Sequence, residues 1–325
     1  MKPPRRQFLH LAAGAASVPA LWRVAKAQAY PARPVRIIVP FAAGGGTDIT
    51  ARIIGQWLSE RLGQQFIIEN RPGGGTNIGT EVAARAPGDG YTLLMVGTSN
   101  TTNPLLYDKV NFDLLRDFTA VAGVIRAPHI VVVNLSLPVR TFPEFIAYAK
   151  ANPGKVNMAS AGSGSVGHLA GELFKMLTGA NMQHVPYRGG GPALLDLIAG
   201  QVQVYFAGMP EAVEYVRTGQ VRALAVGTAT RAEAFPDIPA VGEFVSGFES
   251  SIWFGLSAPR NTPRGIIDQL NRETNAGLAD AKIKARFAEL GSTVFPIAPA
   301  EFDQFIAAET EKWGKVVKFA GIKPE

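Results

Sequence analysis

Short β-rich runs alternate with segments of helical periodicity along most of this chain, and this alternation constrains the fold more than any other feature. Such an order is typical of a mostly parallel sheet covered by helices. Residues 35–39, 66–69 and 91–96 are predicted strands, and residues 49–62 and 77–86 are predicted helices between them. This first βαβαβ unit indicates an α/β lobe.

The same alternation begins again near residue 130. Helices are predicted at 143–151, 166–177 and 192–199, and strands at 130–133, 156–159, 184–186, 202–206 and 223–227. The closing stretch instead predicts amphipathic helices at 263–278, 281–290 and 299–319. We expect two α/β lobes, with the C-terminal helices returning to cover the first. Thr47 or Asp48 is the expected N-cap of the first helix.

Residues 1–29 have the anatomy of an export signal. They carry five basic residues and no acid, followed by an apolar stretch and by small residues before an expected cleavage after Ala29. The apolar stretch is shorter than the roughly 20 residues that span a bilayer, so no membrane anchor is expected. Arg5 and Arg6 resemble a twin-arginine signal, and an ordinary secretory signal is the alternative.

The charge of the chain is concentrated in this leader. The whole chain has 32 Lys and Arg against 26 Asp and Glu, and removing the five leader bases leaves 27 against 26. A nearly neutral protein offers no basic excess to nucleic acid. The absence of cysteine excludes disulfides, thiolate catalysis and a lipid-modified cysteine. We therefore expect a soluble periplasmic protein that does not bind nucleic acid.

Three glycine-rich turns each lie between a predicted strand and a predicted helix. They span residues 40–48, 160–168 and 187–192. Glycine lets a loop bring its N–H groups close to a ligand, and the first turn of the following helix adds unpaired donors and a partial positive charge. Such turns bind anions, although any one of them could be a simple connector. In open α/β sheets the ligand lies at this end of the strands.

Other site chemistries are poorly supported. Gly162, Gly164 and Gly167 spell a dinucleotide fingerprint, but the acid expected about 20 residues later is missing. Neither Ser163 nor Ser165 lies in a nucleophile elbow. No Gly-Lys pair is followed by the Ser or Thr of a P-loop. No cofactor is expected.

Three polar side chains outside the leader could contact a ligand. His168 follows a polar loop by one helical turn, and ligand contact and local packing are equal alternatives for it. Arg71 and Arg188 could each pair with a carboxylate or lie in solvent. His129, His168 and His184 form no metal-ligand pair at helical spacing, so no metal site is predicted.

Several stretches closely resemble the Bug family, the periplasmic solute-binding proteins of tripartite tricarboxylate transporters. They include the run 35–48, the segment Glu-Asn-Arg-Pro-Gly-Gly-Gly-Thr-Asn-Ile-Gly at 69–79, and Asp-Gly-Tyr-Thr-Leu-Leu at 89–94. The resemblance continues in order through 159–173, 184–195, 221–226, 236–239, 253–263 and 313–325. It covers essentially the whole mature chain and is highly specific.

The resemblance implies a type II periplasmic-binding-protein fold, in which two α/β lobes close on a small carboxylated ligand. Lobe 1 would comprise residues 30–130 and 254–325 and lobe 2 residues 131–253, with crossings near 130–133 and 253–256. The ligand's carboxylate would be held by backbone N–H groups and ordered waters. The residues expected to bind the ligand are Phe41, Ala42, Ala43, Gly44, Gly45, Gly46, Thr47, Asp48, Ser99, Asn100, Thr101, Ser160, Ala161, Gly162, Ser163, Gly164, His168, Ala207 and Gly208.

The expected function is that of a non-enzymatic, monomeric binding protein. It would capture a di- or tricarboxylate or an aromatic acid and hand it to the permease subunits of a tripartite tricarboxylate transporter. Many family members carry Asp or Asn where this chain has Ala207 and Gly208, so a simple carboxylate is expected rather than an amino acid. An extracytoplasmic sensor for a signalling receptor and, less favoured, a secreted hydrolase are the alternatives.

Overall fold

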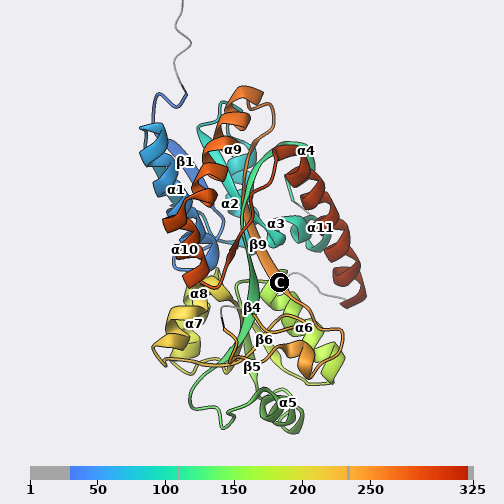
Figure 1. Cartoon of the computed structure of the whole chain (residues 1–325). Helices are drawn as coiled ribbons and strands as arrows, with labels where there is room; N and C mark the ends of the chain where they lie inside the picture. Colours follow the sequence, from blue (N-terminus) through green and yellow to red (C-terminus); the bar gives the residue numbers. More distant parts are fainter. Residues whose placement is uncertain (1–29, 108–109, 233–234, 321–325) are drawn as a thin grey trace, which may run out of the picture.

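The computed structural model describes residues 30–107, 110–232 and 235–320. The predicted export signal, residues 1–29, lies outside the described residues. Figure 1 shows two groups of helices, one around the upper and one around the lower part of the molecule, with two long strands running through its middle. Along the described segments, none of the helices combines the length and apolarity that a bilayer crossing requires.

The upper part is built on one portion of the sheet, here called sheet A. Its strand order is β2-β1-β3-β9-β4, with β1, β2 and β3 parallel and β9 antiparallel to both of its neighbours. The strands of sheet A are β1 Val35–Val39, β2 Phe66–Asn70, β3 Thr92–Gly97, β9 Ser251–Pro259 and β4 Phe118–Val133, and the short strand β10 Thr293–Val294 also pairs with β4. The strands that alternate with helices are thus parallel, as the sequence predicted.

The lower part is built on a second portion, sheet B, which shares β4 with sheet A. Its order is β4-β7-β5-β6, and β8 also pairs with β4. The strands of sheet B other than β4 are β5 Asn157–Ser160, β6 Gln183–Pro186, β7 Val204–Gly208 and β8 Arg222–Val226. The first eleven residues of β4, Phe118–Pro128, pair with β9, and the last five, His129–Val133, pair with β7. This one strand therefore joins the two parts.

Helices cover the faces of sheet A. They are α1 Gly46–Leu62, α2 Asn77–Ala84, α3 Thr98–Leu106, α4 Leu114–Asp117, α9 Arg264–Ala279, α10 Ala281–Glu289 and α11 Pro299–Ala320. The C-terminal helices return to this part, as predicted: the Trp57 indole of α1 donates to the Glu273 carbonyl of α9 at 2.8 Å, and α11 packs against α3 and β4. Buried aliphatic side chains such as Ile37 and Ile54 fill the space between helices and sheet.

Four helices surround sheet B, namely α5 Phe142–Ala151, α6 Val166–Thr178, α7 Gly190–Ile198 and α8 Met209–Arg217. Their core contains an aromatic cluster in which the rings of Phe142, Phe145, Phe174 and Phe206 lie within 6.2 Å of a neighbouring ring. Four aromatic side chains bury a large apolar area in one place, which fixes α5 and α6 on the sheet.

The first helix begins earlier than predicted. α1 starts at Gly46 and its N-cap is Gly45, so the expectation of Thr47 or Asp48 as N-cap is wrong. The Asp48 carboxylate instead lies inside the first turn, where it accepts from the Gly44 N–H at 3.0 Å and from the guanidinium of Arg52. An acid within the first helical turn is stabilised by the helix dipole, so it marks the helix start without being its cap.

Candidate ligand-binding site

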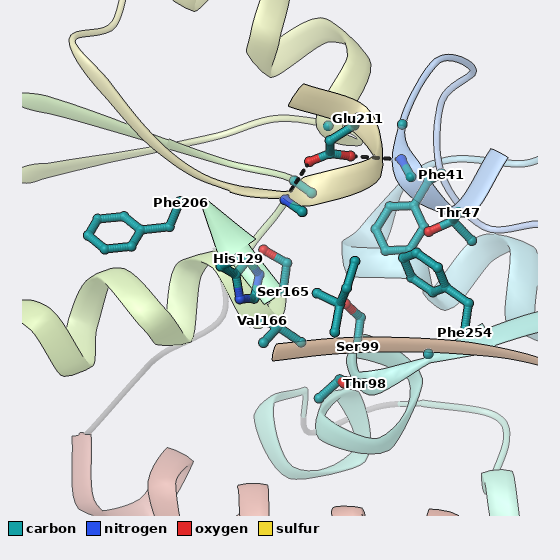
Figure 2. Close-up of a pocket in the computed structure, with 18 of the residues that line it drawn as sticks. Phe41, Thr47, Thr98, Ser99, His129, Ser165, Val166, Phe206, Glu211 and Phe254 are labelled. Atoms are coloured by element: carbon teal, nitrogen blue, oxygen red, sulfur yellow. Dashed lines mark hydrogen bonds between the residues drawn. The ribbon is translucent and has the colours of Figure 1, made fainter. Parts of the chain in front are cut away.

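A cavity lies between the two parts of the molecule, at the ends of strands from both sheets (Figure 2). Its walls enclose about 530 Å³ of non-protein space, which includes the opening to solvent. The lining residues are Phe41, Gly45, Gly46, Thr47, Gly97, Thr98, Ser99, His129, Ala161, Ser165, Val166, Gly167, Gly190, Tyr205, Phe206, Gly208, Glu211, Ile252, Trp253 and Phe254.

Five helices present their N-termini to this cavity. The lining includes Gly45 before α1, Gly97 before α3, Ser165 before α6, Gly190 at the start of α7 and Gly208 before α8. The first N–H groups of a helix have no acceptor within it, and the helix dipole places partial positive charge there. The lining contains neither lysine nor arginine. The cavity therefore attracts anions through backbone groups.

One buried carboxylate, that of Glu211, partly balances this positive potential. Its Oε2 accepts from the Gly46 N–H at 2.8 Å, and its Oε1 accepts from the Tyr205 hydroxyl at 2.6 Å and from the Gly208 N–H at 3.1 Å (Figure 2). Burial raises the pKa of Glu211, and these three donors act to lower it. Because α1 stands on sheet A and α8 on sheet B, the carboxylate also ties the two parts together.

The middle of the cavity is apolar. Phe41 and Phe254 form one side, and Val166 lies on the other (Figure 2). The indole N–H of Trp253, which also lines the cavity, donates to Glu309 of α11 at 3.0 Å. The site thus combines an apolar body with polar ends, an arrangement suited to an organic acid.

The polar residues lie at different places around this apolar body. Figure 2 shows Glu211 at one end, and Thr98 and Ser99 at the start of α3 at the other. The Thr98 hydroxyl is buried and has no hydrogen-bond partner among the described residues. The Ser165 hydroxyl, by contrast, accepts from the His168 N–H at 3.3 Å as the side-chain cap of α6.

His129 lines the cavity from β4, the strand that joins the two sheets. It is fully buried, and its Nδ1 lies 2.8 Å from the Ser250 hydroxyl. Burial lowers the pKa of His129 to about 4, so the ring is neutral near pH 7. Its position couples the cavity wall to both crossing segments, because Ser250 immediately precedes β9.

The structure brings seven of the predicted site residues to the cavity wall. They are Phe41, Gly45, Gly46, Thr47, Ser99, Ala161 and Gly208. Twelve others are not part of the lining: Ala42, Ala43, Gly44, Asp48, Asn100, Thr101, Ser160, Gly162, Ser163, Gly164, His168 and Ala207. Several of these support the wall from behind. The Asn100 side chain, for example, accepts from the Gly97 N–H at 2.9 Å and donates to Thr80.

His168 shapes the second glycine-rich loop. Its Nδ1 accepts from the Gly164 N–H at 3.1 Å, and its ring stacks on that of His184 with centroids 3.7 Å apart. Burial, with a smaller effect from the charge of Lys175, lowers the pKa of His168 to about 4, which keeps Nδ1 available as an acceptor. Of the two alternatives for this residue, the structure shows local packing.

The two arginines singled out from the sequence lie outside this lining. Arg71 is exposed and pairs with Glu69. Arg188 lines a smaller adjoining cavity of about 230 Å³ next to the loop formed by Gly73, Gly74 and Gly75. Within the described part of the chain, no group of three or more His, Asp and Glu side chains is placed to hold a metal ion.

The sequence interpretation missed Glu211, the only acidic residue on the wall among the described residues. A signal was present: Pro210 and Glu211 occupy the second and third positions of α8, a pattern that marks a helix start. It could not reveal that the carboxylate would reach back to α1. Ile252 was also missed as a lining residue, because it lies at an element end without a distinctive motif.

Comparisons with known proteins give one consistent result. The model of the family described as tripartite tricarboxylate transporter family receptor matches residues 50–322. The protein BugT of Bordetella pertussis is 38% identical over 303 residues, which cover 91% of this chain and 92% of BugT. Similarity therefore extends over both parts of the molecule.

Solved structures agree with the sequence comparison. An R. palustris protein with adipate superposes with a TM-score of 0.89 at 37% identity, covering 91% of this chain and 100% of that chain. MatC from Rhodopseudomonas palustris, with bound malate, gives a TM-score of 0.84 at 33% identity, covering 89% and 100%. The periplasmic-binding-protein fold expected from the sequence is confirmed.

Proposed function

Since this chain belongs to the tripartite tricarboxylate transporter receptor family, the family of the Bug proteins, we propose that its cavity captures a small organic carboxylate. The family fixes the role of solute-binding receptor. Two structural neighbours that share at least a third of its sequence hold adipate and malate, both carboxylates. We extend this ligand class, small organic carboxylates, from these neighbours to this chain.

One observation carries the proposal: five helix N-termini face a cavity whose lining lacks lysine and arginine. A charge-assisted hydrogen bond contributes about 1.5 to 3 kcal/mol, so a few backbone donors suffice for micromolar binding after ordering costs. The apolar walls formed by Phe41, Phe254 and Ile252 suit an aliphatic or aromatic body. A di- or tricarboxylate or an aromatic acid fits this combination.

Ligand capture would be coupled to closure of two lobes. We assign residues 30–130 with 254–325 to lobe 1 and residues 131–253 to lobe 2. The crossings β4 and β9 are the natural hinges, because β4 pairs in both sheets and the chain enters sheet A through β9. Closure is favoured by a ligand that contacts both lobes. Of the predicted site residues, the seven on the cavity wall would make these contacts.

The receptor would act in the periplasm as a single chain without catalytic activity or cofactor, and would deliver its ligand to the permease subunits of a tripartite tricarboxylate transporter. Residues 1–29 would direct export and be removed. The family assignment supports delivery to a permease. The sensor alternative shares the same site and differs only in the partner, and no feature of the cavity favours the hydrolase.

Thermal unfolding in the presence of adipate, malate, citrate and benzoate tests the proposal. At 100 times its Kd, a ligand stabilises the folded state by about 2.7 kcal/mol, which raises the Tm by roughly 5 °C. At least one acid should do so, while its neutral amide should not. Isothermal titration calorimetry would then give the affinity. A folded protein that responds to no acid, or equally to acid and amide, contradicts the proposal.

A further inference from the structure

The start of α3 forms one end of the cavity. β3 ends at Gly97 and α3 begins at Thr98 without an intervening loop, so the first turn of the helix opens directly into the site. The N–H groups of Thr98 and Ser99 have no acceptor within the helix, as in any first turn. The Asn100 side chain is turned back to the Gly97 N–H at 2.9 Å and so does not cap them.

The Thr98 hydroxyl is an independent sign of a missing partner. Thr98 is 2% exposed, and its Oγ1 has no hydrogen-bond partner among the described residues. The neighbouring hydroxyls are satisfied, since Thr101 donates to the Thr98 carbonyl at 2.7 Å and Thr102 to the Gly164 carbonyl at 3.0 Å. Buried polar groups are rarely left unpaired, because each such group costs free energy. A group in the cavity that accepts this hydroxyl would remove the cost.

The opposite end of the cavity is already occupied by an acidic side chain of the protein. The Glu211 carboxylate takes the N–H groups of Gly46 and Gly208 at the starts of α1 and α8. A ligand carboxylate placed there would find these donors already bound to the Glu211 side chain, and burial raises the pKa of Glu211 without removing those contacts. The two ends in Figure 2 therefore differ: one holds the protein's own carboxylate, and the other has donors without acceptors.

We propose that the ligand's carboxylate binds at the N-terminus of α3, held by the N–H groups of Thr98 and Ser99 and by the Thr98 hydroxyl. This inference rests on the proposed function and adds which end of the cavity holds the charge. The rest of the ligand then lies along Phe41 and Phe254, toward Glu211. Glu211 acts here as a positioning residue, because it takes the N–H groups at its own end of the cavity and leaves the donors of α3 to the ligand's carboxylate.

The test compares two threonines that share burial and an unpartnered hydroxyl but differ in place. Thr274 of α9 is 0% exposed, its Oγ1 also lacks a partner among the described residues, and it is not part of the cavity lining. Thr98→Val and Thr274→Val each remove one unsatisfied hydroxyl, so neither should lower the Tm. Thr98→Val should weaken adipate binding about tenfold or more, as the loss of one charge-assisted hydrogen bond predicts. Thr274→Val should leave it unchanged.

Three further measurements make the outcome specific. Thr98→Ser keeps the hydroxyl and should retain adipate binding even if the valine variant is impaired in folding. The neutral adipamide should bind wild type and Thr98→Val equally weakly. Wild-type affinity in a folded Thr98→Val protein, or equal loss in Thr98→Ser and Thr98→Val, overturns the α3 site. If wild type binds an acid with an affinity that does not depend on Thr98, only the proposed α3 site is wrong. If wild type binds no acid at all, the proposed function is wrong as well.

Discussion

The two glycine-rich loops that precede α1 and α6 have similar sequences but different hydrogen-bond partners. The first, residues 40–48, brings Gly45, Gly46 and Thr47 to the cavity, and the Gly46 N–H donates across it to Glu211. The second, residues 160–168, also lines the cavity, through Ala161, Ser165, Val166 and Gly167, but it is held by two histidines rather than by an acid across the cavity. Its Ser160 hydroxyl contacts His184 and its Gly164 N–H donates to His168. A glycine-rich signature therefore predicts a tight loop, and the partners of the loop decide its role.

Removing Glu211 should have the largest effect, because among the described residues it is the only side chain that accepts a hydrogen bond from the first loop across the cavity. Glu211→Ala leaves the Gly46 and Gly208 N–H groups and the Tyr205 hydroxyl without their acceptor. The free energy of unfolding should fall by about 3 kcal/mol, since buried donors left unpaired cost about 1 to 3 kcal/mol each and water replaces part of the loss. Urea unfolding measures this change.

A neighbouring acid on the same helix provides the control. Glu214 of α8 is exposed and pairs only with Arg217 at 3.0 Å. Glu214→Ala should change the free energy of unfolding by less than about 0.5 kcal/mol. Equal effects of the two substitutions would show that Glu211 does not fasten the first loop.

Replacing one glycine by valine in each loop should distinguish the effect of the loop on stability from its effect on ligand binding. Gly164 has φ +76°, and a Cβ there would lie 2.2 Å from Leu106 Cδ1, so Gly164→Val should cost about 2 kcal/mol of stability. Gly45 has an extended backbone, with φ −82° and ψ 167°, and a Cβ would lie 3.3 Å from the Gly190 N. Gly45→Val should therefore leave the Tm nearly unchanged and weaken ligand binding about tenfold by crowding the closed cavity.

Calorimetric unfolding and adipate titration of both variants decide between these effects. The proposed difference between the two loops is contradicted if Gly45→Val lowers the Tm as much as Gly164→Val does. It is also contradicted if Gly164→Val remains as stable as wild type and loses only its ligand, because the second loop would then be a direct binding element.

The sequence predicted the strands well and the cavity only in part, for physical reasons. β1 and β2 are short β-branched runs between turn residues, so their ends were found within one residue. α3 was missed because its sequence, Thr-Ser-Asn-Thr-Thr-Asn-Pro-Leu-Leu, is polar and lacks a helical apolar period. Its hydroxyls instead donate to backbone carbonyls, that of Thr101 to Thr98 within the helix and that of Thr102 to Gly164 in the second loop. The first half of β4, rich in alanine and glycine, was likewise unrecognised.

The cavity is harder to predict because its wall is made of helix starts that are distant in sequence. Glu211 lies 165 positions from Gly46, and no local pattern links them. Each helix start can be recognised in the sequence by itself, for example from the glycine turn before α1 and the Pro-Glu pair in α8. Their convergence follows from strand order, which places the ends of β1, β3, β5 and β7 around one space.

The smallest predicted effect concerns pH and again distinguishes the loops. The second loop contacts two stacked histidines, and burial lowers the pKa of His168 from 6.5 to about 4. The unfolded chain therefore binds a proton at higher pH than the folded protein does. The stability associated with neutral His168 is fully present above pH 6.5 and is lost as the pH falls toward 4. The His168→Asn variant removes this titration while keeping an acceptor for the Gly164 N–H.

Between pH 7 and pH 5, wild type should lose about 1 to 2 kcal/mol more of its free energy of unfolding than His168→Asn does, as measured by urea unfolding at each pH. Acidic pH should loosen the second loop in this way, because protonated Nδ1 can no longer accept from Gly164. The first loop is held instead by the carboxyl group of Glu211, whose pKa is raised by burial. If the free energy of unfolding depends on pH in the same way for wild type and His168→Asn, the stacked histidines do not hold the second loop. The contrast between the two loops would then rest on Glu211 alone.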